Sequence, residues 1–191
     1  MSLELLGRGP SRPDLLEDLV VDEATIAETL GRWSVKAPVV VESDRATGQP
    51  ALDEVVEVLA GGAPAVVDVA PGLGAARADG VANTAGGPDP AQSVAHLADL
   101  LVVATHAGVG FGSGLIPRCA DASQVWALLA GAVAAMTGDD VRSAIAAPDP
   151  AAIVGQSRSA REAIRDVITC VLVPRGQAAT ITTDLMTADR G

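Results

Sequence analysis

The sequence predicts an α/β fold, a three-layer sandwich in which helices cover both faces of a mainly parallel sheet. Four short runs, at 37–44, 64–71, 100–105 and 167–174, are largely apolar, as expected of strands that are buried on both faces. Amphipathic segments with apolar residues at helical spacing separate these runs. Strands that alternate with such helices favour a parallel sheet with helices packed on it.

The N-terminal region is expected to be helical. Over 12–33, acidic residues alternate with Leu, Val and Ile at helical spacing, which predicts one or two amphipathic helices, with Asp22 as a cap and Gly31 as a stop. We therefore expect 1–34 to be a helical segment that packs on a single α/β domain comprising 1–191.

The middle region carries the clearest predicted helix. In 49–62, four apolar residues share one face and two glycines follow, which predicts a helix that ends at the glycines. After the strand at 64–71, we expect a long loop at 72–90, a helix at 91–99, and then the strand at 100–105.

The C-terminal half is expected to be mostly helical. The predicted helices are 121–140, 139–146 and 157–166. Asp121 or Ser123 is the expected cap of the first. A second strand is expected at 179–186, after the one at 167–174, and the Arg-Gly-Gln between them suits a hairpin, which would add an antiparallel strand to the sheet.

The composition favours a folded, acidic protein. Hydrophobic residues make up 49% and charged residues 19% of the 191 residues, which is too apolar for a disordered chain and long enough for one domain with its own core. The formal net charge is −11, so the phosphates of a nucleic acid or of an anionic membrane would be repelled. We expect neither as a partner.

The cysteines and the N-terminus indicate the cellular setting. Cys119 and Cys170 are too few for a disulfide framework or a closed zinc site. The chain shows neither a leader-like N-terminus nor an apolar run long enough to span a bilayer, so we expect a soluble, cytoplasmic protein. Arg118 beside Cys119 would lower the pKa of that thiol; an ordinary, unreactive cysteine is the alternative.

Two segments of the chain have similar sequence patterns. Each of 65–76 and 101–112 pairs an apolar run with a G-x-G turn. Because ligands in open α/β sheets bind outside the carboxyl ends of the strands, we expect both turns to face one crevice and to offer backbone N–H groups to an anion. The candidate ligand-binding residues are Gly72, Gly74, Gly108, Gly110, Gly112 and Ser113. The alternative is that these glycines only shape turns, since neither segment completes a dinucleotide or phosphate-loop motif.

The candidate catalytic residues are His106 and Asp68. His106 follows the predicted strand at 100–105, where an acid or base would lie. Asp68 closes another predicted strand, and in a shared crevice its carboxylate would orient the imidazole. The alternatives are a structural histidine and an aspartate that caps a helix or accepts in a turn.

Three arginines share one face of a predicted helix: Arg158, Arg161 and Arg165. Glu162 lies within reach of two of them, so local ion pairs are one interpretation. The other is the docking of an acidic partner, such as the strongly acidic region 1–60 of a second subunit.

Two segments of the middle region carry a resemblance to a known family. They are VVDVAPGLG at 66–74, an acid-bearing strand followed by Pro-Gly, and LADLLVVATH at 97–106. Together they are similar to the deviant Walker ATPases of the ParA and MinD type. The resemblance implies a nucleotide-binding fold, but the lysine-bearing phosphate loop of that family is missing. What it implies is therefore a degenerate relative that keeps a regulatory partner surface, with no ATPase activity.

Three functional hypotheses follow. The first is a protein that binds a small anionic metabolite, and is an enzyme if His106 acts as an acid or base. The second is a non-catalytic assembly or scaffold subunit, favoured by the Ala-rich helix within 121–140. The third is the degenerate ParA- or MinD-like fold. We expect a homo-oligomer, while the sequence indicates no particular substrate, cofactor or metal.

Overall fold

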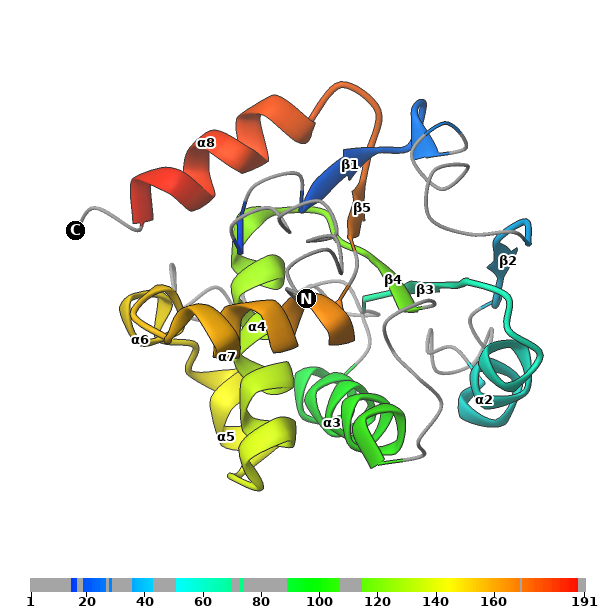
Figure 1. The fold of residues 1–191 in the computed structure, drawn as a ribbon, viewed down its shortest axis with the longest axis horizontal. Coiled ribbons are helices and arrows are strands. Elements are labelled where there is room, and N and C mark those ends of the chain that lie inside the picture. Colours follow the sequence, from blue (N-terminus) through cyan, green and yellow to red (C-terminus); the bar gives the residue numbers. More distant parts are fainter. Residues whose placement is uncertain are drawn as a thin grey trace, which may run out of the picture.

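A parallel sheet of five strands organises the part of the chain that the structure describes (Figure 1). The computed structural model describes residues 15–16, 19–26, 28, 36–42, 51–69, 73, 89–106, 115–168 and 170–188. The strand order is β1-β5-β4-β3-β2, and every described pairing is parallel. The strands are β1 (Val20–Asp22), β2 (Val39–Val40), β3 (Ala65–Asp68), β4 (Leu115–Arg118) and β5 (Val171–Val173). The predicted α/β fold with a mainly parallel sheet is confirmed.

Seven helices are described along the chain. They are α2 (Leu52–Ala60), α3 (Pro90–His106), α4 (Ala122–Thr137), α5 (Val141–Ala146), α6 (Pro150–Val154), α7 (Arg158–Val167) and α8 (Ala178–Ala188). The predicted start of α4 is confirmed, because the Asp121 side chain accepts a hydrogen bond from the backbone N–H of Gln124 at 3.0 Å. The helix ends at Gly138, whose φ of 78° suits a residue without a Cβ.

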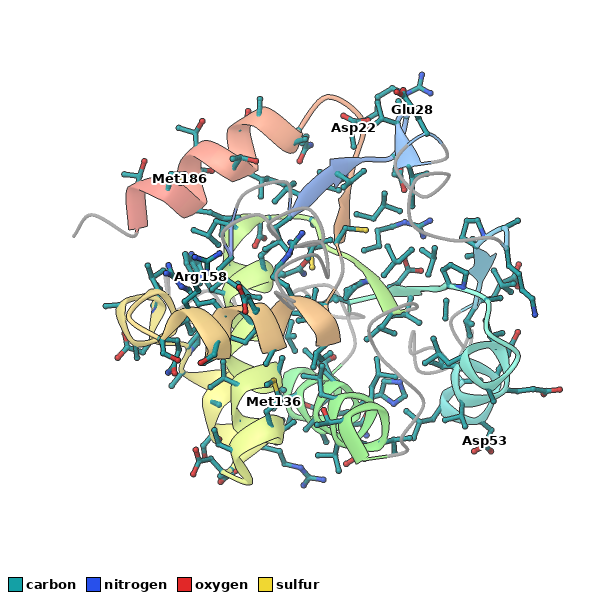
Figure 2. All side chains as sticks on the ribbon, in the orientation of Figure 1. Asp22, Glu28, Asp53, Met136, Arg158 and Met186 are labelled. Atoms are coloured by element: carbon teal, nitrogen blue, oxygen red, sulfur yellow. The ribbon has the colours of Figure 1, made fainter. Side chains whose placement is uncertain are left out.

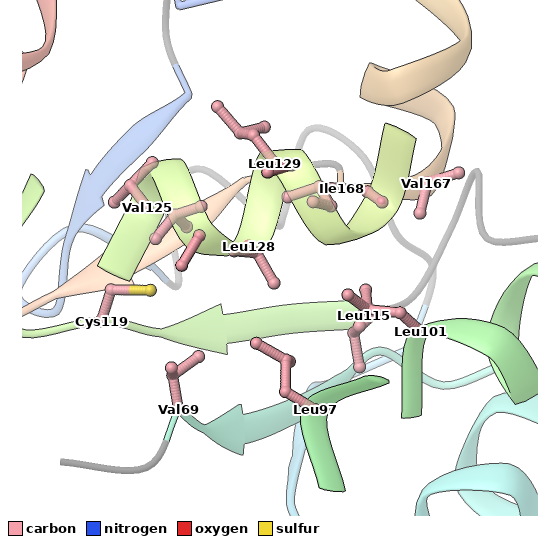
Figure 3. Packing of buried hydrophobic residues seen from close by; sticks show 14 of the residues in the cluster. Val69, Leu97, Leu101, Leu115, Cys119, Val125, Leu128, Leu129, Val167 and Ile168 are labelled. Carbon is pink, nitrogen blue, oxygen red and sulfur yellow. The ribbon is translucent and has the colours of Figure 1, made fainter. Parts of the chain in front are cut away.

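Helix α4 lies at the centre of the core. Figure 3 shows Leu128 on the side of α4 that faces strand β4 and Leu129 on the opposite side of the helix, with Leu97 and Leu101 of α3 near β4. Helices α3 and α5 both pack closely against α4 at Gly131. A Cβ at this position would lie 2.6 Å from the Leu101 side chain and 2.7 Å from that of Ile145, so the close packing of the three helices requires a glycine.

The described helices pack on one face of the sheet. The residues of β3, β4 and β5 alternate between two apolar clusters, and the larger cluster also contains buried residues of α2, α3, α4, α7 and α8. Successive strands β2 to β5 lie side by side, and a right-handed connection, the common form between parallel strands, places each connecting helix on the same face. The second cluster consists of Val21, Val66, Ile116, Cys170 and Leu172, with Ile26 packed against it. The predicted helical cover is therefore seen on one face within the described residues.

The strand predicted at 100–105 is wrong. These residues continue α3, in which Leu97 and Leu101, four positions apart, are buried in the core while Val102 is exposed. A short apolar run has no period that separates a strand from a buried helix. The strand in this region is β4, which begins at Leu115. Its Pro117 argues against a strand in the sequence, because a proline lacks the N–H that a central strand donates.

The strand predicted at 179–186, with its antiparallel hairpin, is also wrong. The segment forms α8, in which Ile181 and Leu185 are buried four residues apart. Its β-branched residues suggested a strand, but the hydroxyls of Thr183 and Thr187 donate to the carbonyl oxygens four residues earlier, at 2.8 Å each. Burial of one helical face outweighed the local strand preference.

The prediction of one or two helices over 12–33 is wrong for part of this region. Val20–Asp22 form β1, which pairs with β5 in the register Val20 to Val171. Leu19, directly before β1, is fully buried in the main core. Tertiary burial at the sheet edge thus decides the conformation of a segment whose local spacing predicted a helix.

Candidate functional site

Three charged side chains meet at the carboxyl edge of the sheet. Arg118, the last residue of β4, donates from Nη1 to Oδ1 of Asp68 at 2.7 Å. Its Nε lies 2.8 Å from Oε1 of Glu23. We call Glu23, Asp68 and Arg118 the Arg118 cluster. Their side chains are 41%, 39% and 33% exposed, so solvent reaches all three.

Strand register positions the Arg118 cluster. Asp68 and Arg118 are direct partners at the ends of the adjacent parallel strands β3 and β4. Glu23 directly follows β1, and its N–H donates to the carbonyl oxygen of Val173 at the end of β5 at 3.1 Å. Arg118 on β4 thus contacts Asp68 on the adjacent strand β3 and, across β5, Glu23 directly after β1.

The guanidinium of Arg118 keeps donors for a further group. An arginine carries five N–H donors in a planar fork. Among the described residues, its Nη1 and Nε face carboxylates, and neither a hydrogen bond nor an ion pair is found for Nη2. An incoming carboxylate or phosphate would find the bidentate geometry that arginine favours.

The N-terminus of α4 opens beside this edge, but its own side chains occupy it. The Asp121 carboxylate accepts from the N–H of Gln124 and from the hydroxyl of Ser123, at 3.0 and 2.6 Å. The Gln124 side chain in turn accepts from the N–H of Ala120 at 2.7 Å. A negative charge therefore caps the helix where an anion would otherwise bind, so Arg118 is the better anion contact.

Asp22 fixes the end of β1 and thereby places Glu23. Its Oδ1 accepts from the N–H of Ala24 at 2.8 Å, and its Oδ2 accepts from the N–H of Gly176. These backbone hydrogen bonds hold the pKa of the Asp22 carboxyl below its ordinary value. Figure 2 shows Asp22 beside the turn that joins β5 to α8. The contact ties β1 to that turn.

Asp68 lies at a strand end, as the sequence predicted, and its role in orienting His106 stays a prediction. It ends β3 and pairs with Arg118. His106 is the last residue of α3, and its side chain lies outside the described residues. Because α3 replaces the predicted strand, the segment 107–114 leads into the amino end of β4, whereas Asp68 lies at the carboxyl end of its neighbour β3. The premise that both glycine segments follow strands is wrong.

The predicted glycine site falls outside the described residues. This holds for Gly72, Gly74, Gly108, Gly110, Gly112 and Ser113. Their ligand-binding role and the catalytic role of His106 stay predictions. Among the described residues, no group of three or more histidine, cysteine or acidic side chains is arranged to hold a metal ion.

The two cysteines are buried thiols. Cys119 is 1% exposed, and its burial, with Asp121 nearby, raises the thiol pKa despite the neighbouring Arg118. Burial raises the pKa of Cys170 to about 11 against the opposing charge of Arg165. Both observations favour the unreactive alternative for Cys119.

On α7, the predicted local ion pair is present. Arg158 Nε and Glu162 Oε1 lie 3.1 Å apart, one helical turn from each other. Arg161 and Arg165 are half-buried rather than fully displayed on the surface. The face of α7 that carries the three arginines is therefore partly buried against the rest of the protein.

Sequence reasoning missed the pairing of Arg118 with Asp68 and Glu23. The acids and the arginine are far apart in the chain and become neighbours only through the parallel register. The prediction put a strand at 100–105 and none at 115–118, so it did not place Arg118 at a strand end. A prediction of β4 at 115–118 would have set it opposite Asp68.

No family model, curated protein or solved structure matches this chain. No helix among the described residues is long and apolar enough to cross a membrane.

Proposed function

We propose that this protein binds a small anionic ligand at the carboxyl edge of its sheet, with Arg118 as the cation that meets the ligand. The observation that carries the proposal is the partly exposed side chain of Arg118, held between Asp68 at the end of the adjacent strand β3 and Glu23 directly after β1. Ligands of open α/β sheets bind at this edge.

The two acids of the Arg118 cluster hold the guanidinium in place without closing the site. Partly exposed ion pairs contribute only about 0–1 kcal/mol each, so a ligand carboxylate or phosphate can replace one of them at low cost. The remaining acid then accepts a hydrogen bond from a hydroxyl or amine of the ligand. A ligand with one anionic group and neighbouring donors fits this arrangement better than a polyanion, which the net charge of −11 would repel.

The test is a thermal-shift screen of the full chain against monocarboxylates, sugar phosphates and nucleotides. A ligand present at 100 times its Kd stabilises the native state by about 2.7 kcal/mol. We expect such a shift for the parent and its loss in Arg118→Gln. Arg142→Gln is the matched control, because Arg142 forms an exposed pair with Asp99 at 3.6 Å, away from the cluster.

Two results would contradict the proposal: no ligand class that stabilises the parent, or an equal shift in Arg118→Gln. The variants His106→Ala and Gly110→Val, run in the same screen, test the separate prediction that the segment 107–114 takes part. A shift lost in these variants and retained in Arg118→Gln would move the site from Arg118 to the glycines.

A second candidate function, a non-catalytic assembly subunit, is favoured by one observation. Among the described strands, β2 lies at an edge of the sheet, and its residues Val39 and Val40 are 39% and 52% exposed. An apolar edge strand is a template for pairing with another chain.

A further inference from the structure

We propose that two copies of this chain associate through antiparallel pairing of their β2 strands, which joins the two sheets into one. The proposal does not depend on ligand binding at Arg118. Of the strands that the structure describes, β2 is the last on its side of the sheet, and it lies at the right of Figure 1.

The edge strand exposes apolar side chains on both of its faces. Among the described residues, four large hydrophobic side chains are exposed, and two of these are the neighbours Val39 and Val40. Successive residues of a strand point to opposite faces of the sheet. The edge is therefore apolar on either side, which suits the addition of another strand.

The backbone of β2 has its open hydrogen-bonding side at Val40. The N–H groups of Val39 and Val41 donate to β3, at 2.8 Å to Pro64 and 3.0 Å to Val66. Because these groups alternate in direction along a strand, the N–H and C=O of Val40 point away from β3. No hydrogen bond from Val40 to a residue outside the ladder with β3 is found in the described part of the chain.

Charge complementarity selects a second copy and its register. Lys36 and Glu42 are both exposed and lie symmetrically on either side of Val39. In an antiparallel pair with Val39 on the twofold axis, each Lys36 lies opposite Glu42 of the second copy. The ammonium of Lys36 carries three donors, so it keeps its hydrogen bond to the Gly61 carbonyl in this arrangement.

The same register accommodates Pro38. Val40 then lies opposite Pro38 of the second copy, so the Val40 N–H donates to the Pro38 carbonyl oxygen, twice by symmetry. Pro38 has no N–H to donate, and only the carbonyl of Val40 remains without a partner, which costs less than an orphaned N–H. The two Val39 side chains meet on the axis as an apolar cross-strand pair.

The first experiment is sedimentation velocity of the full chain over a wide concentration range. We expect a concentration-dependent dimer. Val40→Pro removes the outward N–H and spares the hydrogen bonds to β3, so it should abolish the dimer, whereas the matched control Val40→Thr keeps the N–H and should keep the dimer. Glu42→Lys sets two like charges opposite each other and should raise the dissociation constant about tenfold.

A cysteine pair tests the register even if Val40→Pro folds poorly. With Val39 on the axis, Val39→Cys places the two thiols in a non-hydrogen-bonded pair with a Cα separation of about 4.5 Å, within the range of disulfides. Val40→Cys places them diagonally, about 7–8 Å apart, which is too far. Cys119 and Cys170 are 1% and 3% exposed, so they contribute no background crosslink to the native protein.

We expect mild oxidation to crosslink Val39→Cys into a covalent dimer and to leave Val40→Cys monomeric on a denaturing gel. A strictly monomeric parent would overturn the proposal, as would a dimer that is unchanged in Val40→Pro and is not crosslinked by Val39→Cys. A crosslink in Val40→Cys alone would overturn the register.

Discussion

The two edges of the sheet are built in opposite ways. At the β1 edge, Leu19 is fully buried, Asp22 accepts two backbone N–H groups, and Glu23 pairs with Arg118. At the β2 edge, the strand is only two residues long and both are exposed. The described chain thus ties β1 down with its own contacts, which makes this the closed edge, and leaves both residues of β2 exposed, which makes that the open edge.

The closed edge adjoins the Arg118 cluster, and the open edge does not. A binding site needs side chains held in place, and the contacts of β1 hold Glu23 against Arg118. An association edge needs unused backbone groups and apolar surface, which the valines of β2 offer. The two proposals therefore belong to different ends of the strand order.

The largest effect that separates the two edges is expected from truncating apolar side chains. Leu19→Ala should lower the free energy of unfolding by about 2–5 kcal/mol, because a fully buried leucine leaves a cavity in the main core. Val40→Ala, the matched truncation at the other edge, should change it by less than about 0.5 kcal/mol. Urea denaturation at low protein concentration measures both without a contribution from association. Equal costs would contradict the comparison.

A smaller effect is expected at the turn that closes the β1 edge. Gly176 has a φ of 79°, and a Cβ there would meet nothing within 4 Å. Gly176→Ala should therefore cost about 1–2 kcal/mol through backbone strain alone. Asparagine tolerates the left-handed region better than alanine does, so Gly176→Asn should cost less. If both variants cost the same in urea denaturation, the strain explanation fails.

The sequence predicted the class of the fold better than its details. Apolar runs at 64–71 and 167–174 do contain β3 and β5, because strands buried on both faces need such runs. The run at 100–105 has the same composition and is helical, because it continues the buried face of α3. Composition alone contains no information that separates these cases.

The candidate site was predictable in part. Asp68 was placed at a strand end because an acid after an apolar run is visible in the sequence. Its partner Arg118 was not, since β4 contains Pro117 and its pairing depends on register across the sheet. Glu23 was assigned to a helix, and the contact that turns it toward Arg118 requires the pairing of β1 with β5.

The smallest effect is expected from the pH dependence of the β1 contact. Asp22 accepts N–H groups from Ala24 and Gly176, which lowers its pKa in the folded protein below the ordinary value of 3.8. A carboxyl with a lowered pKa stabilises the fold fully above 3.8, and the contribution disappears as the pH falls through the folded value. The difference in unfolding free energy between the parent and Asp22→Asn should thus be constant from about pH 5 to 8 and shrink below about pH 4. A difference that stayed constant in acid would show that the carboxylate charge at Asp22 does not hold the β1 edge.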